Sequence, residues 1–171
     1  MRLVLASDHA GFLVKQRLVE LLRGEGHEVL DLGTRDETPC DYPDYGFALG
    51  EAVMAGKGRL GIIVCGSSIG VAIAANKVRG VCAAPVTEPY AAELSRRHND
   101  ANVLALSERL TGWDMIERIV RVFLDTPFDG GRHTRRVEKL TNYDERERRK
   151  ALADVERGTV EGAQTPVELL R

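Results

Sequence analysis

The sequence predicts an α/β fold, because short apolar runs alternate along the chain with stretches of helical periodicity. Such an alternation is typical of a parallel sheet covered by helices on both faces. We therefore expect a three-layer α/β/α, Rossmann-like architecture. The length of 171 residues fits a domain with its own hydrophobic core. The five expected strands span residues 2–7, 28–33, 60–65, 81–86 and 102–107.

The first strand and the first helix have clear patterns. Residues 2–7 (RLVLAS) form a short apolar run that ends in polar residues, as a buried strand does. Residues 10–25 follow as a helix, which Gly24 and Gly26 bring to an end. The apolar face of this helix consists of Val14, Leu18, Leu21 and Leu22.

The middle of the chain repeats this pattern. Residues 28–33 predict the second strand, and a loop rich in turn residues over 34–43 leads into a helix that ends at residue 57. Residues 60–65 (LGIIVC) are the most strand-like run of the chain, and a helical stretch over 69–77 comes next.

Two helices and a tail complete the expected order. A helix over 89–99 precedes the last strand, and an amphipathic helix follows that strand. The apolar face of the amphipathic helix consists of Ile116, Ile119, Val120, Phe123 and Leu124. From residue 132 the pattern indicates a long, highly charged helix, and residues 158–171 are polar and expected to be extended. We expect one domain over 1–149 and a helical extension with a tail over 150–171.

Composition and charge exclude several classes of function. Lys and Arg total 24 against 26 Asp and Glu, so the net charge of -2 gives no electrostatic reason to bind nucleic acid or an anionic membrane. No apolar run approaches the roughly 20 residues of a membrane span, and the first residues lack a signal-peptide pattern. Cys40, Cys65 and Cys82 have no metal-like spacing, which indicates free thiols in a cytoplasmic protein.

Two expected strand ends carry residues suited to chemistry. The first strand leads into Ser7-Asp8-His9, and the third leads from Cys65 into Gly66-Ser67-Ser68. If these strands are neighbours, the loops meet where open parallel sheets bind ligands. A glycine-rich turn into a helix suits a phosphate or a developing oxyanion, and it suits Cys65 as a base or nucleophile. The alternative is a small core thiol in a tight turn.

Other polar residues also have two interpretations. Asp8 and His9 suit an acid/base pair, or Asp8 caps the first helix. His98 lies in a polar cluster at a helix end, where a favourable contact with the helix dipole is the alternative to a functional role. Arg132 and Arg136 are four residues apart, so one helical face could direct both guanidiniums at one phosphate. A solvated basic face is the alternative.

Two competing motifs fail. A low-molecular-weight phosphatase loop needs an Arg six residues after its Cys, and Val71 occupies that position here. A dinucleotide fingerprint needs G-x-G-x-x-G after the first strand, where this chain has Asp8-His9-Ala10-Gly11.

Five groups of motifs carry a family resemblance from the first strand to about Leu140. They are SDHAGF (7–12), DYPDY (41–45), CGSSIG with IAANK (65–70, 73–77), EPY with LSRRHNDANVLAL (88–90, 94–106) and GGRHTRRVEKL (130–140). In this order they resemble the type B ribose-5-phosphate isomerases and the related galactose-6-phosphate and allose-6-phosphate isomerases.

The resemblance implies an aldose–ketose isomerisation, most simply of ribose 5-phosphate and ribulose 5-phosphate, without metal or cofactor. It implies that Cys65 moves a proton between C1 and C2 through a cis-enediolate, assisted by the Ser67 hydroxyl. Before that step, His98 opens the sugar ring with help from Asp8. The implied substrate contacts are Asp41, Tyr42 and Asn99 on the sugar, His9, Arg109, Arg132 and Arg136 on the phosphate, and the loop residues Gly66, Ser68 and Gly70.

The resemblance further implies a homodimer, or a dimer of two such dimers, whose active sites are shared between subunits. His98 and the C-terminal arginines would serve the Cys65 loop of the other subunit, and the long final helix would take part in dimerisation. Two residues depart from the family pattern: Ser68 stands where Gly is frequent, and Cys82 where Arg is frequent. The same chemistry on erythrulose 4-phosphate, allose 6-phosphate or galactose 6-phosphate is the near alternative. A non-catalytic sugar-phosphate-binding module is the distant one.

Overall fold

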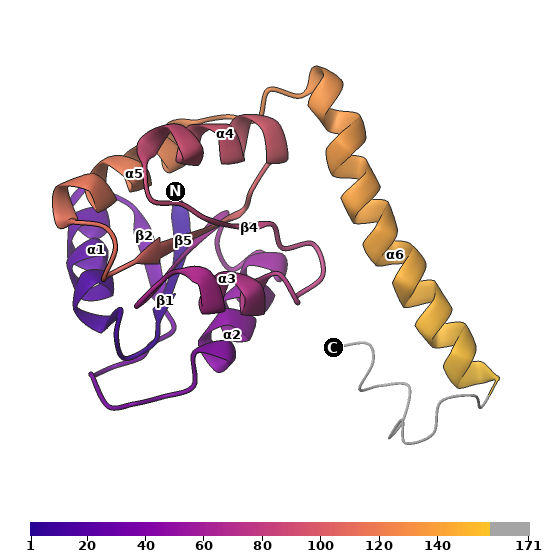
Figure 1. Cartoon of the computed structure of the whole chain (residues 1–171), viewed down its shortest axis with the longest axis horizontal. Coiled ribbons are helices and arrows are strands. Elements are labelled where there is room, and N and C mark those ends of the chain that lie inside the picture. Colours follow the sequence, from indigo (N-terminus) through magenta and orange to yellow (C-terminus); the bar gives the residue numbers. More distant parts are fainter. Residues whose placement is uncertain (158–171) are drawn as a thin grey trace. The chain divides into compact units, whose positions relative to one another are not determined.

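A five-stranded parallel sheet forms the centre of the computed structural model, which describes residues 1–157 (Figure 1). The strand order is β2-β1-β3-β5-β4, so the order reverses between β1 and β3. The sheet confirms the predicted fold class. Its strands are β1 (Arg2–Ser7), β2 (Glu28–Asp31), β3 (Leu60–Cys65), β4 (Ala83–Pro85) and β5 (Val103–Ser107).

The inner strands match their predicted bounds better than the edge strands do. β1 and β3 agree residue by residue, whereas β2 and β4 are shorter than expected. β1, β3 and β5 are paired on both sides and are buried almost throughout. β2 and β4 pair on one side only, and β4 ends at Pro85, which has no N–H to continue a ladder.

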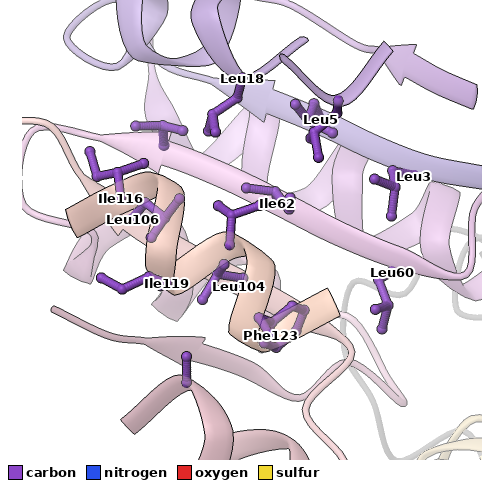
Figure 2. Close-up of a cluster of buried hydrophobic side chains, with 14 of the residues drawn as sticks. Leu3, Leu5, Leu18, Leu60, Ile62, Leu104, Leu106, Ile116, Ile119 and Phe123 are labelled. Carbon is purple, nitrogen blue, oxygen red and sulfur yellow. The ribbon is translucent and has the colours of Figure 1, made fainter. Parts of the chain in front are cut away.

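Helices cover both faces of the sheet. α1 (Phe12–Gly24), α4 (Pro89–Asn99) and α5 (Trp113–Asp125) contribute to one apolar core, and α2 (Tyr42–Met54) and α3 (Ile69–Ala75) contribute to the other. Figure 2 shows the first core, in which strand residues such as Ile62 and Leu104 belong to one cluster with Ile119 and Phe123 of α5. The predicted apolar faces of α1 and α5 are the faces that pack against the sheet.

Local chemistry accounts for the helix boundaries. α4 begins at Pro89 as predicted, because Pro suits the first helical position and the Glu88 carboxylate accepts hydrogen bonds from two backbone N–H groups of the first turn. α1 begins at Phe12, two residues later than expected. The Gly11 N–H donates to Asp8 Oδ1 at 3.0 Å, which closes a turn ahead of the helix. Asp8 therefore stabilises this turn, and the helix-capping position is Gly11.

The C-terminal part forms a second compact unit from Thr134 onward. A short 3₁₀ turn, η1 (Gly131–His133), precedes the long helix α6 (Thr134–Glu156). The helix predicted from residue 132 therefore starts two residues later, because residues 132 and 133 belong to the 3₁₀ turn that the His133 N–H closes on the Gly130 carbonyl. The expected boundary between residues 149 and 150 falls inside α6 and stays a prediction. The tail expected over 158–171 lies outside the described residues. Within residues 1–157, no helix is long and apolar enough to span a membrane.

Candidate active site

The loops after β1, β3 and β5 meet at one edge of the sheet. Ser7 lies opposite Val64 and Cys65 lies opposite Ser107, so the three strands end together. The Asp8 N–H donates to the Val64 carbonyl at 3.2 Å, and the Glu108 N–H donates to the Cys65 carbonyl at 2.9 Å. The predicted meeting of the Asp8 and Cys65 loops is thereby confirmed.

Cys65 is the last residue of β3 and has a sulfur held by the backbone. The residue is 4% exposed, and the Ser68 N–H donates to its Sγ at 3.1 Å. This contact holds the Cys65 sulfur at the carboxyl end of β3, beside the turn that leads into α3.

Ser68 has a backbone conformation that explains why glycine is frequent at its position in the family pattern. Its φ of 65° and ψ of -21° lie in the left-handed region, which glycine adopts most easily. Its side chain is buried, and its Oγ donates to the carbonyl of Ser67. The Ser68 side chain therefore stabilises the turn itself, while the neighbouring Ser67 side chain is exposed.

His9 is oriented by the loop that precedes α2. The Cys40 N–H donates to His9 Nδ1 at 3.2 Å, and the Cys40 sulfur lies 3.8 Å from the same nitrogen. Because Nδ1 is the acceptor, Nε2 of a neutral imidazole carries the hydrogen and can donate it to a ligand. Cys40 is half-buried against His9, and the sequence contains no local signal for this contact.

Tyr42 and Arg109 lie against glycines of the same edge. A Cβ atom at Gly70 would stand 2.9 Å from the Tyr42 ring, and one at Gly66 would stand 3.2 Å from the Arg109 guanidinium. Both side chains thus border the Cys65 loop, and the exposed Asp41 directly precedes Tyr42. Ten predicted site residues belong to this edge: Asp8, His9, Asp41, Tyr42, Cys65, Gly66, Ser67, Ser68, Gly70 and Arg109.

A second cluster lies at the opposite edge of the sheet. α4 runs back across the sheet and ends at His98 and Asn99, and three residues separate it from the start of β5. The Asn102 carbonyl accepts from the Gly61 N–H at the start of β3, whereas Cys65 ends that strand. At about 3.3 Å per residue, a strand of this length separates the two edges by on the order of 15 Å. One subunit therefore does not bring His98 to Cys65.

The second cluster contains an imidazole that the sequence did not single out. The rings of His98 and His133 stack with centroids 4.2 Å apart and an angle of 4° between the planes. Arg132 Nε donates to His133 Nε2 at 3.3 Å. His133 directly follows Arg132 within the GGRHTRRVEKL motif and is buried, although the charged residues of this stretch are exposed.

An ion pair completes this cluster. Arg97 Nε donates to both carboxylate oxygens of Asp129, at 3.0 and 3.2 Å. This hydrogen bond holds the pKa of Asp129 below its usual range, partial desolvation of the carboxylate opposes the shift, and the positive charge of Arg97 adds to it. Possible metal-ligand atoms of His98, Asp129 and His133 lie within 4.8 Å of one another. Arg97 and Arg132 already engage two of these donors, so the local charge favours an anion over a divalent cation.

Arg132 and Arg136 do not share one helix. Arg132 lies in η1, and Arg136 is the third residue of α6. The predicted four-residue helical spacing between the two guanidiniums is therefore wrong. Both side chains are exposed, and their assignment to the phosphate stays a prediction.

The fold and this set of side chains define the class of the protein as an α/β aldose–ketose isomerase. The chain belongs to the Ribose/Galactose Isomerase family, whose model matches residues 3–140. It is 41% identical over 145 residues to ribose-5-phosphate isomerase B of Escherichia coli (strain K12), which covers 85% of this chain and 97% of that protein. The resemblance seen in the sequence is thereby confirmed.

Solved structures agree with this assignment. A ribose-5-phosphate isomerase B from Clostridium thermocellum has a TM-score of 0.85 at 44% identity, covering 86% of this chain and 99% of that one. A ribose-5-phosphate isomerase B from Mycoplasma genitalium, solved with bound ribulose-5-phosphate, has a TM-score of 0.81 at 40% identity. That match covers 84% of this chain and 96% of the other.

Proposed function

We propose that this protein interconverts D-ribose 5-phosphate and D-ribulose 5-phosphate, with Cys65 as the general base. The observation that carries the proposal is the position of the Cys65 sulfur at the end of β3, beneath the Ser68 N–H and beside the loops of Asp8, His9 and Arg109. The solved relative with bound ribulose-5-phosphate supports this choice of substrate.

The proposed reaction starts from the open-chain aldose. The Cys65 thiolate takes the proton from C2, the C2–H electrons form a C1–C2 double bond, and the C1 carbonyl oxygen becomes the enediolate oxygen. The hydroxyl proton on O2 passes to O1. The electrons on O2 then form the C2 carbonyl while C1 takes the proton back from Cys65. The Ser67 hydroxyl and the backbone N–H groups of 66–70 other than that of Ser68 hold the oxygens on which charge develops.

Binding of the substrate uses the remaining predicted residues. His98, with Asp8, opens the ring by proton transfer, and Asp41, Tyr42 and Asn99 contact the sugar. A phosphate dianion is held by His9, Arg109, Arg132 and Arg136. Fixing the phosphate also fixes the position of the reacting carbons C1 and C2. Such positioning contributes a large part of the reduction in the activation barrier of the isomerisation.

The two clusters imply a site that two subunits share. His98 and Arg132 lie at the sheet edge opposite Cys65, so a second copy of the chain would bring them to the Cys65 loop. We propose a homodimer in which α6 makes part of the contact, with pairing of two dimers as a further step. The free thiols of Cys40, Cys65 and Cys82 fit a cytoplasmic setting.

Initial rates on a panel of substrates test the activity. Without added metal, ribose 5-phosphate should be turned over faster than erythrulose 4-phosphate, allose 6-phosphate and galactose 6-phosphate. A faster rate on one of the other sugars would keep the mechanism and reassign the substrate. Binding of all four without turnover of any would contradict the enzyme and favour a binding module.

Mixing two inactive variants tests the shared site. Cys65→Ala and His98→Asn proteins are each expected to be inactive, because each lacks one half of every site. After unfolding and refolding together, half of the dimers are mixed and each has one intact site, so about a quarter of wild-type activity should return. Activity that stays at the level of the separate variants would place both residues in one subunit's site.

A further inference from the structure

We propose that His133 is a positioning residue that holds the ring-opening imidazole of His98 and the phosphate-binding guanidinium of Arg132 in one fixed arrangement. This inference rests on the proposed function, because it assigns His133 a role through those two residues. His133 contacts both of them: its ring stacks on His98, and its Nε2 accepts from Arg132 Nε.

The burial of His133 makes it suitable as a support. It is 6% exposed, whereas Arg132 is exposed and His98 is half-buried. The His133 N–H donates to the Gly130 carbonyl at 3.0 Å, which closes the 3₁₀ turn. The Asp129 N–H donates to the Arg97 carbonyl at 3.1 Å and its carboxylate binds the Arg97 side chain, so the segment that carries His133 is tied to α4.

The contact with Arg132 fixes which donors the guanidinium presents. Nε is directed at His133, so the two terminal nitrogens carry the hydrogen bonds available to an anion. The same hydrogen bond requires that Nε2 of His133 is unprotonated, and the hydrogen of the neutral ring is therefore on Nδ1. An exposed arginine that is already held through Nε loses less conformational freedom on binding phosphate than an arginine without such a contact.

The contact with His98 fixes a ring plane. Near-parallel stacking covers one face of the His98 imidazole and leaves its edge, where the nitrogens lie, unobstructed by His133. A proton transfer to or from the ring oxygen of a sugar needs that edge in a defined direction. One buried ring thus orients the groups that bind the two ends of the same substrate.

Two variants separate the two contacts. His133→Phe keeps a ring that can stack and removes the acceptor for Arg132. KM for ribose 5-phosphate and the inhibition constant of inorganic phosphate should therefore both rise by about 10-fold, with kcat nearly unchanged. His133→Gln keeps an acceptor and removes the ring, so its main effect should be a fall in kcat of about 3- to 10-fold.

A double variant distinguishes positioning from general stability. If His133 acts on phosphate binding through Arg132, adding His133→Phe to Arg132→Ala should raise KM no further than Arg132→Ala alone. Additive effects on KM would overturn the proposal. The proposal would also be overturned if both single variants lowered kcat and raised KM by the same factors. A loss of kcat with an altered pH profile in His133→Phe would instead make His133 a proton-transfer group.

The protonation of the two ring nitrogens of His133 can be measured in the wild-type protein, so this test does not depend on the folding of a variant. In ¹⁵N spectra of histidine-labelled protein, the His133 ring should show an unprotonated Nε2 and a protonated Nδ1, and His133→Gln identifies the signals by their absence. A protonated Nε2 would contradict the arrangement. This readout and phosphate binding remain valid if no sugar phosphate is turned over, so failure of the proposed function is distinguishable from failure of this inference.

Discussion

Replacing Cys65 with Ala should reduce kcat for ribose 5-phosphate by about 10³-fold or more, because the proposed general base is removed and general-base catalysis contributes factors of this order. The side chain is small and buried, and Ala fills most of its volume, so the fold should be retained. KM or the inhibition constant of inorganic phosphate should change by less than about 3-fold, since Cys65 does not bind the phosphate. Steady-state kinetics with circular dichroism as a check of folding measure both.

A matched control is available on the same chain. Cys82 is half-buried just before β4, at the edge of the sheet opposite Cys65. Cys82→Ala should therefore keep near wild-type kcat, and a thiol-specific alkylating reagent should inactivate the wild type and the Cys82→Ala protein at similar rates. Substrate should protect both proteins from the reagent. Residual turnover of Cys65→Ala within 10-fold of wild type would remove Cys65 from the role of base.

The parts of the fold that the sequence predicted well depend on local chemistry. β3 ends at Cys65 and α4 spans Pro89–Asn99, both as expected, because a continuous apolar run marks the strand and Pro89 with Glu88 marks the helix start. The end of β2 was less predictable, because residues 32–34 still form hydrogen bonds with β1, while Gly33 has a φ of 108° that interrupts the extended backbone. That position depends on the sheet and not on the apolar pattern.

The positions of site residues were predictable where those residues come directly after a strand. They were much less predictable where residues distant in the sequence contact each other in the fold. Asp8 and Cys65 were placed together because parallel strands end at one edge. The stack of His98 on His133 joins residues 35 positions apart, and no periodicity relates them. The support of His9 by the Cys40 N–H comes from a backbone group, so the identity of residue 40 carries no information about it.

A buried ion pair that the sequence did not reveal supplies the largest expected effect on stability. Lys15 is 1% exposed on α1, and its Nζ lies 2.7 Å from both carboxylate oxygens of Asp31, which ends β2. Asp31→Asn leaves this ammonium buried without a counter-charge. The free energy of unfolding in urea should fall by about 3–5 kcal/mol. Lys15→Met should cost less, because the Asp31 side chain is 17% exposed and also accepts from the Gly33 N–H.

The order of the variants by free energy of unfolding is a sharper test of the Lys15–Asp31 pair than the value for any single variant. Breaking a buried pair costs more than replacing it, so Lys15→Met combined with Asp31→Asn should be more stable than Asp31→Asn alone. The exposed pair of Arg121 and Glu25, whose side chains are 49% and 33% exposed at 2.6 Å, provides the control. Arg121→Ala should cost less than about 1 kcal/mol despite the short distance. If Asp31→Asn cost no more than Arg121→Ala, the Lys15 ammonium would have to reach water or another acceptor in the variant. The pair would then not be the link that holds α1 to the end of β2.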